Sequence, residues 1–168
     1  MRRLRFFFLI PLCFSVIGLN AQTTDPGFKL MLDSIFDRGI PQVSVEEFIR
    51  MKKTEVFVLD TREKEEYEVS HLKNARHAGY FWFDMRSVYD IPLDAQIVLY
   101  CSIGDRSEKI AQKLINSGYK HVYILYGGIF EWVNSGQPVY NRKSVQTSEI
   151  HTFSRKLARW VEKGTLVN

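Results

Sequence analysis

The stretch that decides the fold is IVLYCSIGDRSEKIAQKLINSGYKHVYIL, residues 97–125. It opens with an apolar, β-branched run typical of a buried strand and closes with a second such run, HVYIL, at 121–125. Between the two runs, residues 106–118 carry apolar side chains on one helical face and end at Gly118. Strands that alternate with helices at this spacing predict a parallel α/β fold.

The sequence on either side of this stretch adds elements of the same kind. VFVLD at 56–60 is a short β-branched and apolar run, which predicts a third buried strand. Ser44 is followed three residues later by Glu47, a capping box that indicates the start of a helix. Apolar side chains at helical spacing predict a helix in 28–37, and a Gly-Gly turn leads into a short helix in 129–136.

The C-terminal part, residues 139–168, is interpreted as a polar linker followed by an amphipathic helix. Phe153, Leu157, Trp160 and Val161 form an apolar stripe among basic residues. We expect this helix to dock on the domain, and the alternative is a helix that binds a membrane surface or a partner.

The N-terminus has the layout of a secretory signal peptide over residues 1–21. MRRLR is a positive patch, FFFLIPLCFSVIGL is an apolar run, and LNA precedes Gln22 as a cleavage site. The run is short for a membrane span of roughly 20 residues, so an uncleaved anchor is the less favoured alternative. A lipoprotein modified on Cys13 is weaker still. We therefore expect a protein exported to a periplasm or secreted, not stably inserted in a membrane after cleavage, with a helical lead-in over 22–42.

Removal of the signal peptide changes the charge and the cysteine count. The full chain has 23 Lys and Arg against 19 Asp and Glu, and the signal peptide accounts for three arginines and no acid. The mature chain is therefore nearly neutral, which gives no basis for nucleic-acid binding. Of two cysteines, Cys101 alone remains, so no internal disulfide can form. This thiol is either buried and inert or reactive.

Cys101 ends a predicted strand, and a helix follows it near Arg106. In open α/β sheets, ligands bind beyond the carboxyl ends of the strands. Several backbone N–H groups of the short loop and the helix dipole would favour an anion there, and Gly104 allows the tight backbone. We expect this cradle to favour the thiolate of Cys101, with Arg106 as a fixed positive charge at its far edge. The result would be a nucleophile beside an anion-binding site.

Two long segments resemble the rhodanese-like domain family. VLYCSIGDRSEKIAQKLINSGYKHVYILYGGIFEW (98–132) is similar to the second half of these domains, with an active loop of the type Cys-x-x-Gly-x-Arg-Ser, a helix, a strand, Gly-Gly and Trp. VFVLDTREKEEYEVSHLKNARH (56–77) is similar to the first half, with Asp-x-Arg after the strand and a histidine further on. The resemblance covers residues 43–138 and implies the rhodanese-like α/β fold, a central parallel sheet flanked by helices on both faces.

The resemblance also implies a sulfurtransferase. Cys101 would take sulfane sulfur from a small donor such as thiosulfate or another persulfide source and carry it as a persulfide. The acceptor would be a thiol, including a protein thiol, or a cyanide-like nucleophile, and Arg106 would act with the cysteine. No metal or organic cofactor is implied. The remaining residues of the substrate-binding loop would be Ser102, Ile103, Gly104, Asp105 and Ser107.

Three residues outside the loop are expected to support it. Asp60 and Arg62 match the family's Asp-x-Arg, and we favour a structural ion pair over a catalytic role. His71 matches a family histidine, for which a structural hydrogen-bonding role is favoured. The loop itself departs from many thiosulfate-using relatives, because Ser102 stands where they have Arg and Asp105 adds an acid. The cradle is less cationic for both reasons, which argues against thiosulfate as the physiological donor.

Two other functions stay open. A cysteine phosphatase or arsenate reductase must hold a tetrahedral oxyanion, in a loop with one residue more between Cys and Arg. Four residues lie between Cys101 and Arg106, and the tighter ring suits a single sulfur atom better. A non-catalytic binding or redox-sensing module is the other alternative, because a fold alone does not establish turnover.

Overall fold

The structure is a computed structural model that describes residues 25–51 and 55–167. The expected signal peptide, residues 1–21, lies outside these ranges. Within them, no helix combines the length and the apolar character that a membrane crossing requires.

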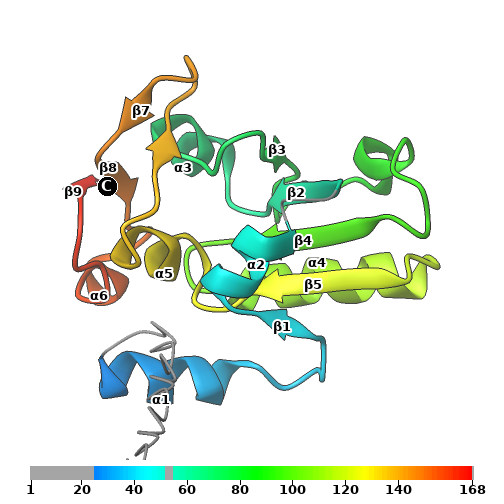
Figure 1. Ribbon diagram of the computed structural model, residues 1–168, viewed down its shortest axis with the longest axis horizontal. Coiled ribbons are helices and arrows are strands. Elements are labelled where there is room, and N and C mark those ends of the chain that lie inside the picture. The colour runs from blue at the N-terminus through cyan, green and yellow to red at the C-terminus, as the bar shows by residue number, and fades with distance from the viewer. Residues whose placement is uncertain (1–24, 52–54, 168) are drawn as a thin grey trace, which may run out of the picture.

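A five-stranded parallel sheet forms the centre of the molecule, in the order β1-β5-β4-β2-β3 (Figure 1). β2, β4 and β5 confirm the three predicted strands. β1 and β3 at the two edges have two residues each, too few for an apolar run to show in the sequence. The strands are β1 (Gln42–Val43), β2 (Val56–Asp60), β3 (Arg76–His77), β4 (Gln96–Tyr100) and β5 (His121–Leu125).

Helices cover both faces of the sheet, which confirms the predicted fold class. α1, α2, α3 and α5 contribute side chains to the buried cluster on one face, whereas α4 and the 3-10 helix η1 pack against the other. In Figure 1, α2 lies in front of the sheet and α4 behind it. The helices are α1 (Pro26–Ile35), α2 (Val45–Met51), α3 (Lys64–Val69), η1 (Met85–Val88), α4 (Asp105–Asn116) and α5 (Gly128–Asn134).

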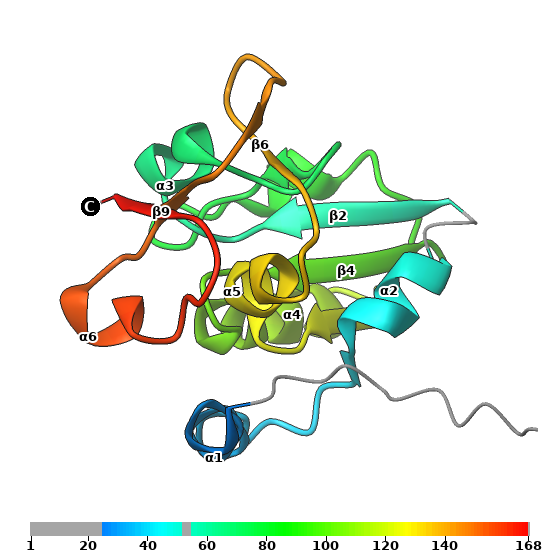
Figure 2. The same cartoon turned by 60° about the vertical axis from the view of Figure 1, so that its left-hand side comes forward.

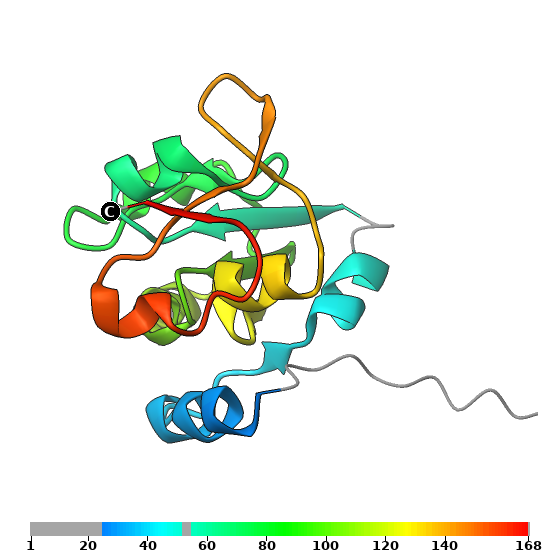
Figure 3. The ribbon, with the colours of Figure 1, turned by 90° about the vertical axis from the view of Figure 1, so that its left-hand side faces the viewer.

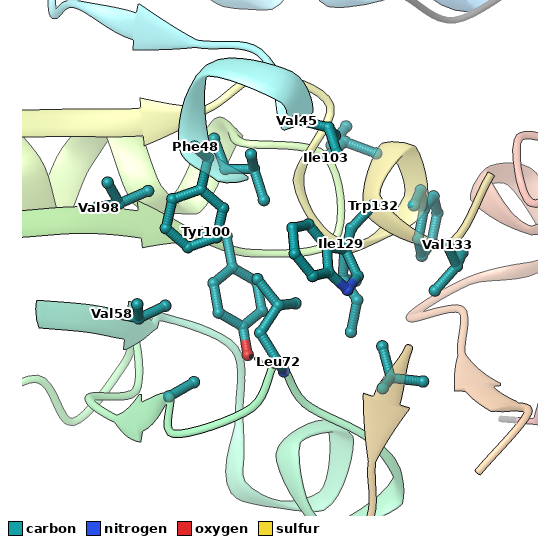
Figure 4. Close-up of a cluster of buried hydrophobic side chains, with 14 of the residues drawn as sticks. Val45, Phe48, Val58, Leu72, Val98, Tyr100, Ile103, Ile129, Trp132 and Val133 are labelled. Atoms are coloured by element: carbon teal, nitrogen blue, oxygen red, sulfur yellow. Dashed lines mark hydrogen bonds between the residues drawn. The ribbon is translucent and has the colours of Figure 1, made fainter. Parts of the chain in front are cut away.

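The apolar side chains of β4 point alternately to the two faces of the sheet, so helices must bury both faces. Val98 and Tyr100 belong to one buried cluster, and Ile97 and Leu99 belong to the other. Figure 4 shows the first cluster, in which side chains from α2 and α5 pack over Val98 and Tyr100. The hydroxyl of Tyr100 accepts a hydrogen bond from the backbone N–H of Leu72 at 3.1 Å, so this buried phenol keeps a polar partner.

The two helices that precede β2 begin at capping side chains. At α1, the carboxylate of Asp25 accepts hydrogen bonds from two backbone N–H groups of the first turn. At α2, the backbone N–H of Ser44 donates to the Glu47 carboxylate at 2.8 Å, and the Glu47 N–H donates to the Ser44 hydroxyl at 3.2 Å. This reciprocal pair confirms the predicted capping box.

The C-terminal segment, residues 139–167, differs from the expected linker and long amphipathic helix. Its one helix, α6, is a single turn that begins after Ser154, and short strands surround it. Phe153 and Gly164 adopt positive φ angles of 62° and 114°, which interrupt any longer helix. Figures 2 and 3 show the segment running along one side of the domain, past α5. Its elements are β6 (Val139–Tyr140), β7 (Gln146–Thr147), β8 (Glu149–His151), α6 (Arg155–Ala158) and β9 (Thr165–Val167).

Candidate active site

Cys101 directly follows β4, at the carboxyl edge of the parallel sheet. Its side chain is 1% exposed. The backbone N–H of Gly104 donates a hydrogen bond to the Cys101 Sγ at 3.0 Å, and α4 begins at the next residue. In the described part of the chain no other group donates to this sulfur. Of the expected ring of amides, the Gly104 amide contacts the sulfur, which also lies near the positive end of a twelve-residue helix.

Position 104 requires glycine for two reasons, its backbone angle and the atoms packed against it. Its φ is 114°, and a Cβ at this position would lie 2.4 Å from the ring carbon Cζ of Phe36. Phe36 follows α1, so the N-terminal lead-in packs directly on the loop. The side chain of Glu108 holds this lead-in in place, because it accepts hydrogen bonds from the backbone N–H groups of Asp37 and Arg38 at 3.2 and 2.9 Å.

The start of α5 supports the loop from the other side. The backbone N–H of Ile129 donates to the carbonyl of Cys101 at 2.9 Å, and that of Phe130 donates to the carbonyl of Ser102 at 3.2 Å. A Cβ on Gly128 would lie 2.3 Å from the Cys101 carbonyl oxygen, and the φ of Gly128 is 58°. The Gly-Gly turn therefore does more than reverse the chain. It lets α5 approach the loop closely enough to bind its backbone.

Arg106 is bound to a buried carboxylate and is not a free cation. Its Nη1 and Nη2 atoms donate to the two oxygens of Glu66 at 2.6 and 2.8 Å, and Nη2 also donates to the Ser102 hydroxyl at 3.0 Å. Arg106 is 8% exposed and Glu66 2%. Burial alone would raise the pKa of Glu66, but the hydrogen bonds and charge of Arg106 outweigh it and hold the pKa below its ordinary value. The expected positive charge at the edge of the loop is thus neutralised within the protein.

Glu66 is a site residue that the sequence did not reveal. It occupies the third position of α3, where its carboxylate accepts a hydrogen bond from the backbone N–H of Glu63 at 3.1 Å. An acid at this position is an ordinary capping residue. Its second role depends on Arg106, which lies 40 residues away in the chain, and no local pattern signals that distance.

A cavity of about 90 Å³ borders Cys101. This volume is well below the roughly 300–1,000 Å³ of a site for a drug-sized ligand. Two of the predicted loop residues, Gly104 and Ser107, do not line it, and the Ser107 hydroxyl instead pairs with that of Thr61 at 2.9 Å. The lining residues are Cys101, Ser102, Ile103, Asp105, Arg106, Phe153 and Leu157. The last two belong to the C-terminal segment, to which the sequence assigned no part in the site.

This loop lies with β2, β4, β5, α3, α4 and α5 within residues 44–135, which match the family model described as a rhodanese-like domain. The chain belongs to the rhodanese-like domain family. The part of the C-terminal segment that reaches the cavity lies outside the matched range.

Relatives and solved structures agree with the family. The chain is 32% identical over 84 residues to the thiosulfate sulfurtransferase GlpE of Coxiella burnetii, covering 49% of this chain and 76% of the relative. It is 33% identical over 121 residues to the tRNA uridine(34) hydroxylase of Hamiltonella defensa, but spans 34% of that protein. The crystal structure of a thiosulfate sulfurtransferase from Pseudomonas aeruginosa shares the fold, with a TM-score of 0.59 at 19% identity, over 80% of this chain and 26% of that one.

Three residues that match the rhodanese-like pattern lie outside the cavity lining. Arg62 is fully buried, and its guanidinium donates to the Asp60 carboxylate and to the carbonyl of Ser70. The ring Nδ1 of His71 lies 2.9 Å from the carbonyl oxygen of Tyr67. All three side chains, of Asp60, Arg62 and His71, therefore make contacts that stabilise the segment between β2 and β3. Among the described residues, no group of three or more His, Cys, Asp or Glu is placed to hold a metal ion.

Proposed function

We propose that this rhodanese-like protein is a sulfurtransferase that moves sulfane sulfur from a small donor to a thiophilic acceptor through a persulfide on Cys101. The observation that carries the proposal is the position of the sulfur. It lies at the carboxyl end of β4, accepts a hydrogen bond from Gly104 at the start of α4, and borders a small cavity. A helix N-terminus and a backbone amide both stabilise negative charge on sulfur.

The transfer takes place in two balanced steps. The thiolate of Cys101 attacks the outer sulfur of a donor such as a hydropersulfide, R–S–SH. The S–S bond of the donor breaks, R–S⁻ leaves, and the enzyme carries Cys–S–SH. With thiosulfate the leaving group is sulfite. An acceptor thiolate or cyanide then attacks the outer sulfur of the persulfide, and the Cys101 thiolate is regenerated. No outside oxidant or reductant is consumed.

The charge in the pocket favours a weakly charged donor over a dianion. Arg106 is already neutralised by Glu66, and Asp105 lines the same cavity. Ile103 gives the pocket an apolar side. A dianionic donor such as thiosulfate would find no unpaired side-chain cation among the residues that line the cavity, whereas a hydropersulfide carries at most one charge on its sulfur and needs less compensation. Hydropersulfides are therefore the favoured donor class.

Mass spectrometry of the intact protein tests the proposal. We expect the protein, incubated with polysulfide or a hydropersulfide and then treated with an alkylating trap, to gain the mass of one sulfur atom on Cys101. Cyanide should remove that mass and yield thiocyanate. If no donor adds sulfur to Cys101, the protein is not a sulfurtransferase.

A non-catalytic binding module is the second candidate, and one observation favours it. The Cys101 side chain is 1% exposed, so a donor reaches it only through the small cavity. A protein whose thiol stays unloaded in the mass assay, while its fold is intact by circular dichroism, would be such a module.

We also propose that the protein acts outside the cytoplasm, from the signal-peptide layout of residues 1–21. Expression of the full chain in a bacterium, followed by fractionation and N-terminal sequencing, tests this. The expected product is an exported protein that begins at Gln22. A product that retains Met1 in the cytoplasmic fraction would contradict the proposal.

A further inference from the structure

We infer that the C-terminal segment is part of the active site, and that Phe153 is a specificity-determining residue that limits access to Cys101 to small sulfur compounds. That the compounds carry sulfur rests on the proposed function, whereas the restriction of access to Cys101 does not depend on it. Phe153 and Leu157 line the cavity beside the thiol, and both lie beyond residue 135, where the match to the rhodanese-like domain ends.

The ring of Phe153 contacts the catalytic loop directly. The guanidinium carbon of Arg106 lies 4.6 Å from the centre of the ring, within the range of a cation–π contact. Arg106 is thus held between the Glu66 carboxylate and an aromatic face. Because hydrogen bonds to Glu66 and Ser102 fix the arginine, the ring contacts a side chain that is itself held in place.

The backbone at Phe153 adopts an unfavourable conformation to place this ring. Its φ of 62° lies in the left-handed region, which an aromatic residue rarely occupies. The residues on either side fix it there: Thr152 is fully buried and donates its N–H to the carbonyl of Val167, and Ser154 caps α6. Strained residues of this kind persist where the surrounding structure specifies them.

The segment is anchored at both ends, so the ring and Leu157 form a wall and not a free tail. β8 and β9 pair in parallel on either side of α6. After α6, Trp160 stacks on Phe28 of α1 with 5.3 Å between ring centres, and its carbonyl accepts a hydrogen bond from the Asn134 side chain at 2.8 Å. In Figure 1 the carboxyl ends of the strands point toward the side where β8, β9 and α6 lie.

The size of the remaining space sets the selectivity. A cavity of about 90 Å³ admits an inorganic polysulfide or another donor of a few heavy atoms. A peptide-sized thiol, or a cysteine on a protein surface, would have to displace Phe153. The wall therefore favours small sulfur compounds over persulfidated proteins as donors.

Alkylation of Cys101 measures access without any need for turnover. In a Cys13→Ser background, where Cys101 is the one thiol of the chain, the rates with iodoacetamide and with a bulky polymer-linked maleimide are compared. Phe153→Ala should raise the rate with the bulky reagent at least about tenfold more than the rate with the small one, an effect of about 1.4 kcal/mol. Phe153→Leu should keep most of the selectivity.

The matched control is Phe81→Ala. Phe81 is 72% exposed and Phe153 is 53% exposed, so both are surface phenylalanines, but Phe81 does not line the cavity. The control should leave both alkylation rates unchanged. If Phe153→Ala also leaves their ratio unchanged, or if the wild-type protein shows the same ratio of rates as a free cysteine in solution, the inference is wrong.

Sulfur loading then separates the inference from the proposed function. Loading by inorganic polysulfide and by glutathione hydropersulfide is followed by mass in the same variants. Phe153→Ala should speed loading by the larger donor more than it changes loading by polysulfide. Size-selective alkylation with no loading by either donor would overturn the sulfurtransferase function and support the wall. Loading by both donors in an unchanged ratio would support the function and overturn the wall.

Discussion

The loop over residues 101–107 and the segment over 152–158 lie on two sides of one cavity, and they are built differently. Buried polar contacts fix the loop: backbone bonds to α5, the Glu66–Arg106 pair and the Ser107–Thr61 hydroxyls. Backbone hydrogen bonds also hold the segment, but the side chains that it turns toward the cavity, Phe153 and Leu157, make ring and aliphatic contacts, and Phe153 is half exposed. The difference teaches that buried polar contacts position the sulfur of Cys101, so a single substitution among them should lower the stability of the protein strongly. The side chain that limits access to the sulfur is half exposed, so its replacement should lower the stability much less.

Replacement of Cys101 by Ala gives the largest expected effect and tests the loop side of the comparison. Sulfur loading and transfer should fall to the background of the assay, because the nucleophile is gone. The melting temperature should change little, since the replaced group is small. Intact-protein mass and thermal denaturation are the two measurements. Transfer that survives in this variant would refute the assignment of Cys101.

Arg106→Ala should be the most destabilising single change in the loop. It leaves the Glu66 carboxylate buried without its partner, which costs about 3–5 kcal/mol of unfolding free energy. Urea denaturation measures the loss. The double variant with Glu66→Gln should recover part of it, because no unpaired charge then remains. A double variant no more stable than Arg106→Ala would show that the pair is not the source of the loss.

Gly104→Ala tests how tightly the loop fits the N-terminal lead-in. The added Cβ meets the Phe36 ring, and an alanine is strained at a φ of 114°. Together these should cost about 2–4 kcal/mol. Phe36→Ala in the same chain should remove the clash but not the backbone strain. A double-mutant cycle in urea checks this, and additive losses would contradict the contact.

Much of the fold could be predicted from the sequence, because its local signals agree with one another. The strand runs at 56–60, 97–101 and 121–125 and the capping box at Ser44 led to elements found within a residue or two of those positions. Edge strands of two residues carry no readable period. The one-turn α6 was missed because the apolar stripe around Phe153 fits a helix, while the positive φ that interrupts it arises from tertiary contacts.

The site was predictable only in part, for a related reason. Cys101 and its place before a helix follow from the chain itself. The charge around it does not, because Arg106 is neutralised by Glu66 from a distant helix and covered by Phe153 from beyond the family domain. Residues that are distant in the chain and meet only in the folded protein leave no pattern of spacing in a single sequence.

Acid should destabilise the protein through the buried pair that holds the loop. The pKa of Glu66 is lowered in the folded state by Arg106, so this carboxylate contributes stability above its ordinary pKa of about 4.3. That contribution is lost as the pH falls through the lowered value. The urea midpoint should therefore drop at low pH, and Glu66→Gln should flatten the drop. An equal drop in both proteins would assign the acid sensitivity to other groups.

The smallest expected effect concerns the backbone of the covering segment. Phe153→Ala and Phe153→Gly both remove the ring, but only glycine tolerates a φ of 62° without strain. The glycine variant should therefore be more stable than the alanine variant by about 1 kcal/mol. Thermal denaturation of the pair measures the difference. Equal stabilities would show that this backbone relaxes once the ring is gone.

The stacking of Trp160 on Phe28 also supplies an intrinsic optical reporter. The chain has three tryptophans, of which Trp82 is 90% exposed and Trp132 is buried in the core. With Trp82 replaced by Phe, the emission comes from Trp132 and Trp160, and only the latter belongs to the C-terminal segment, two residues after α6. A red shift of the emission when a large ligand enters would report displacement of that segment in real time, without a label.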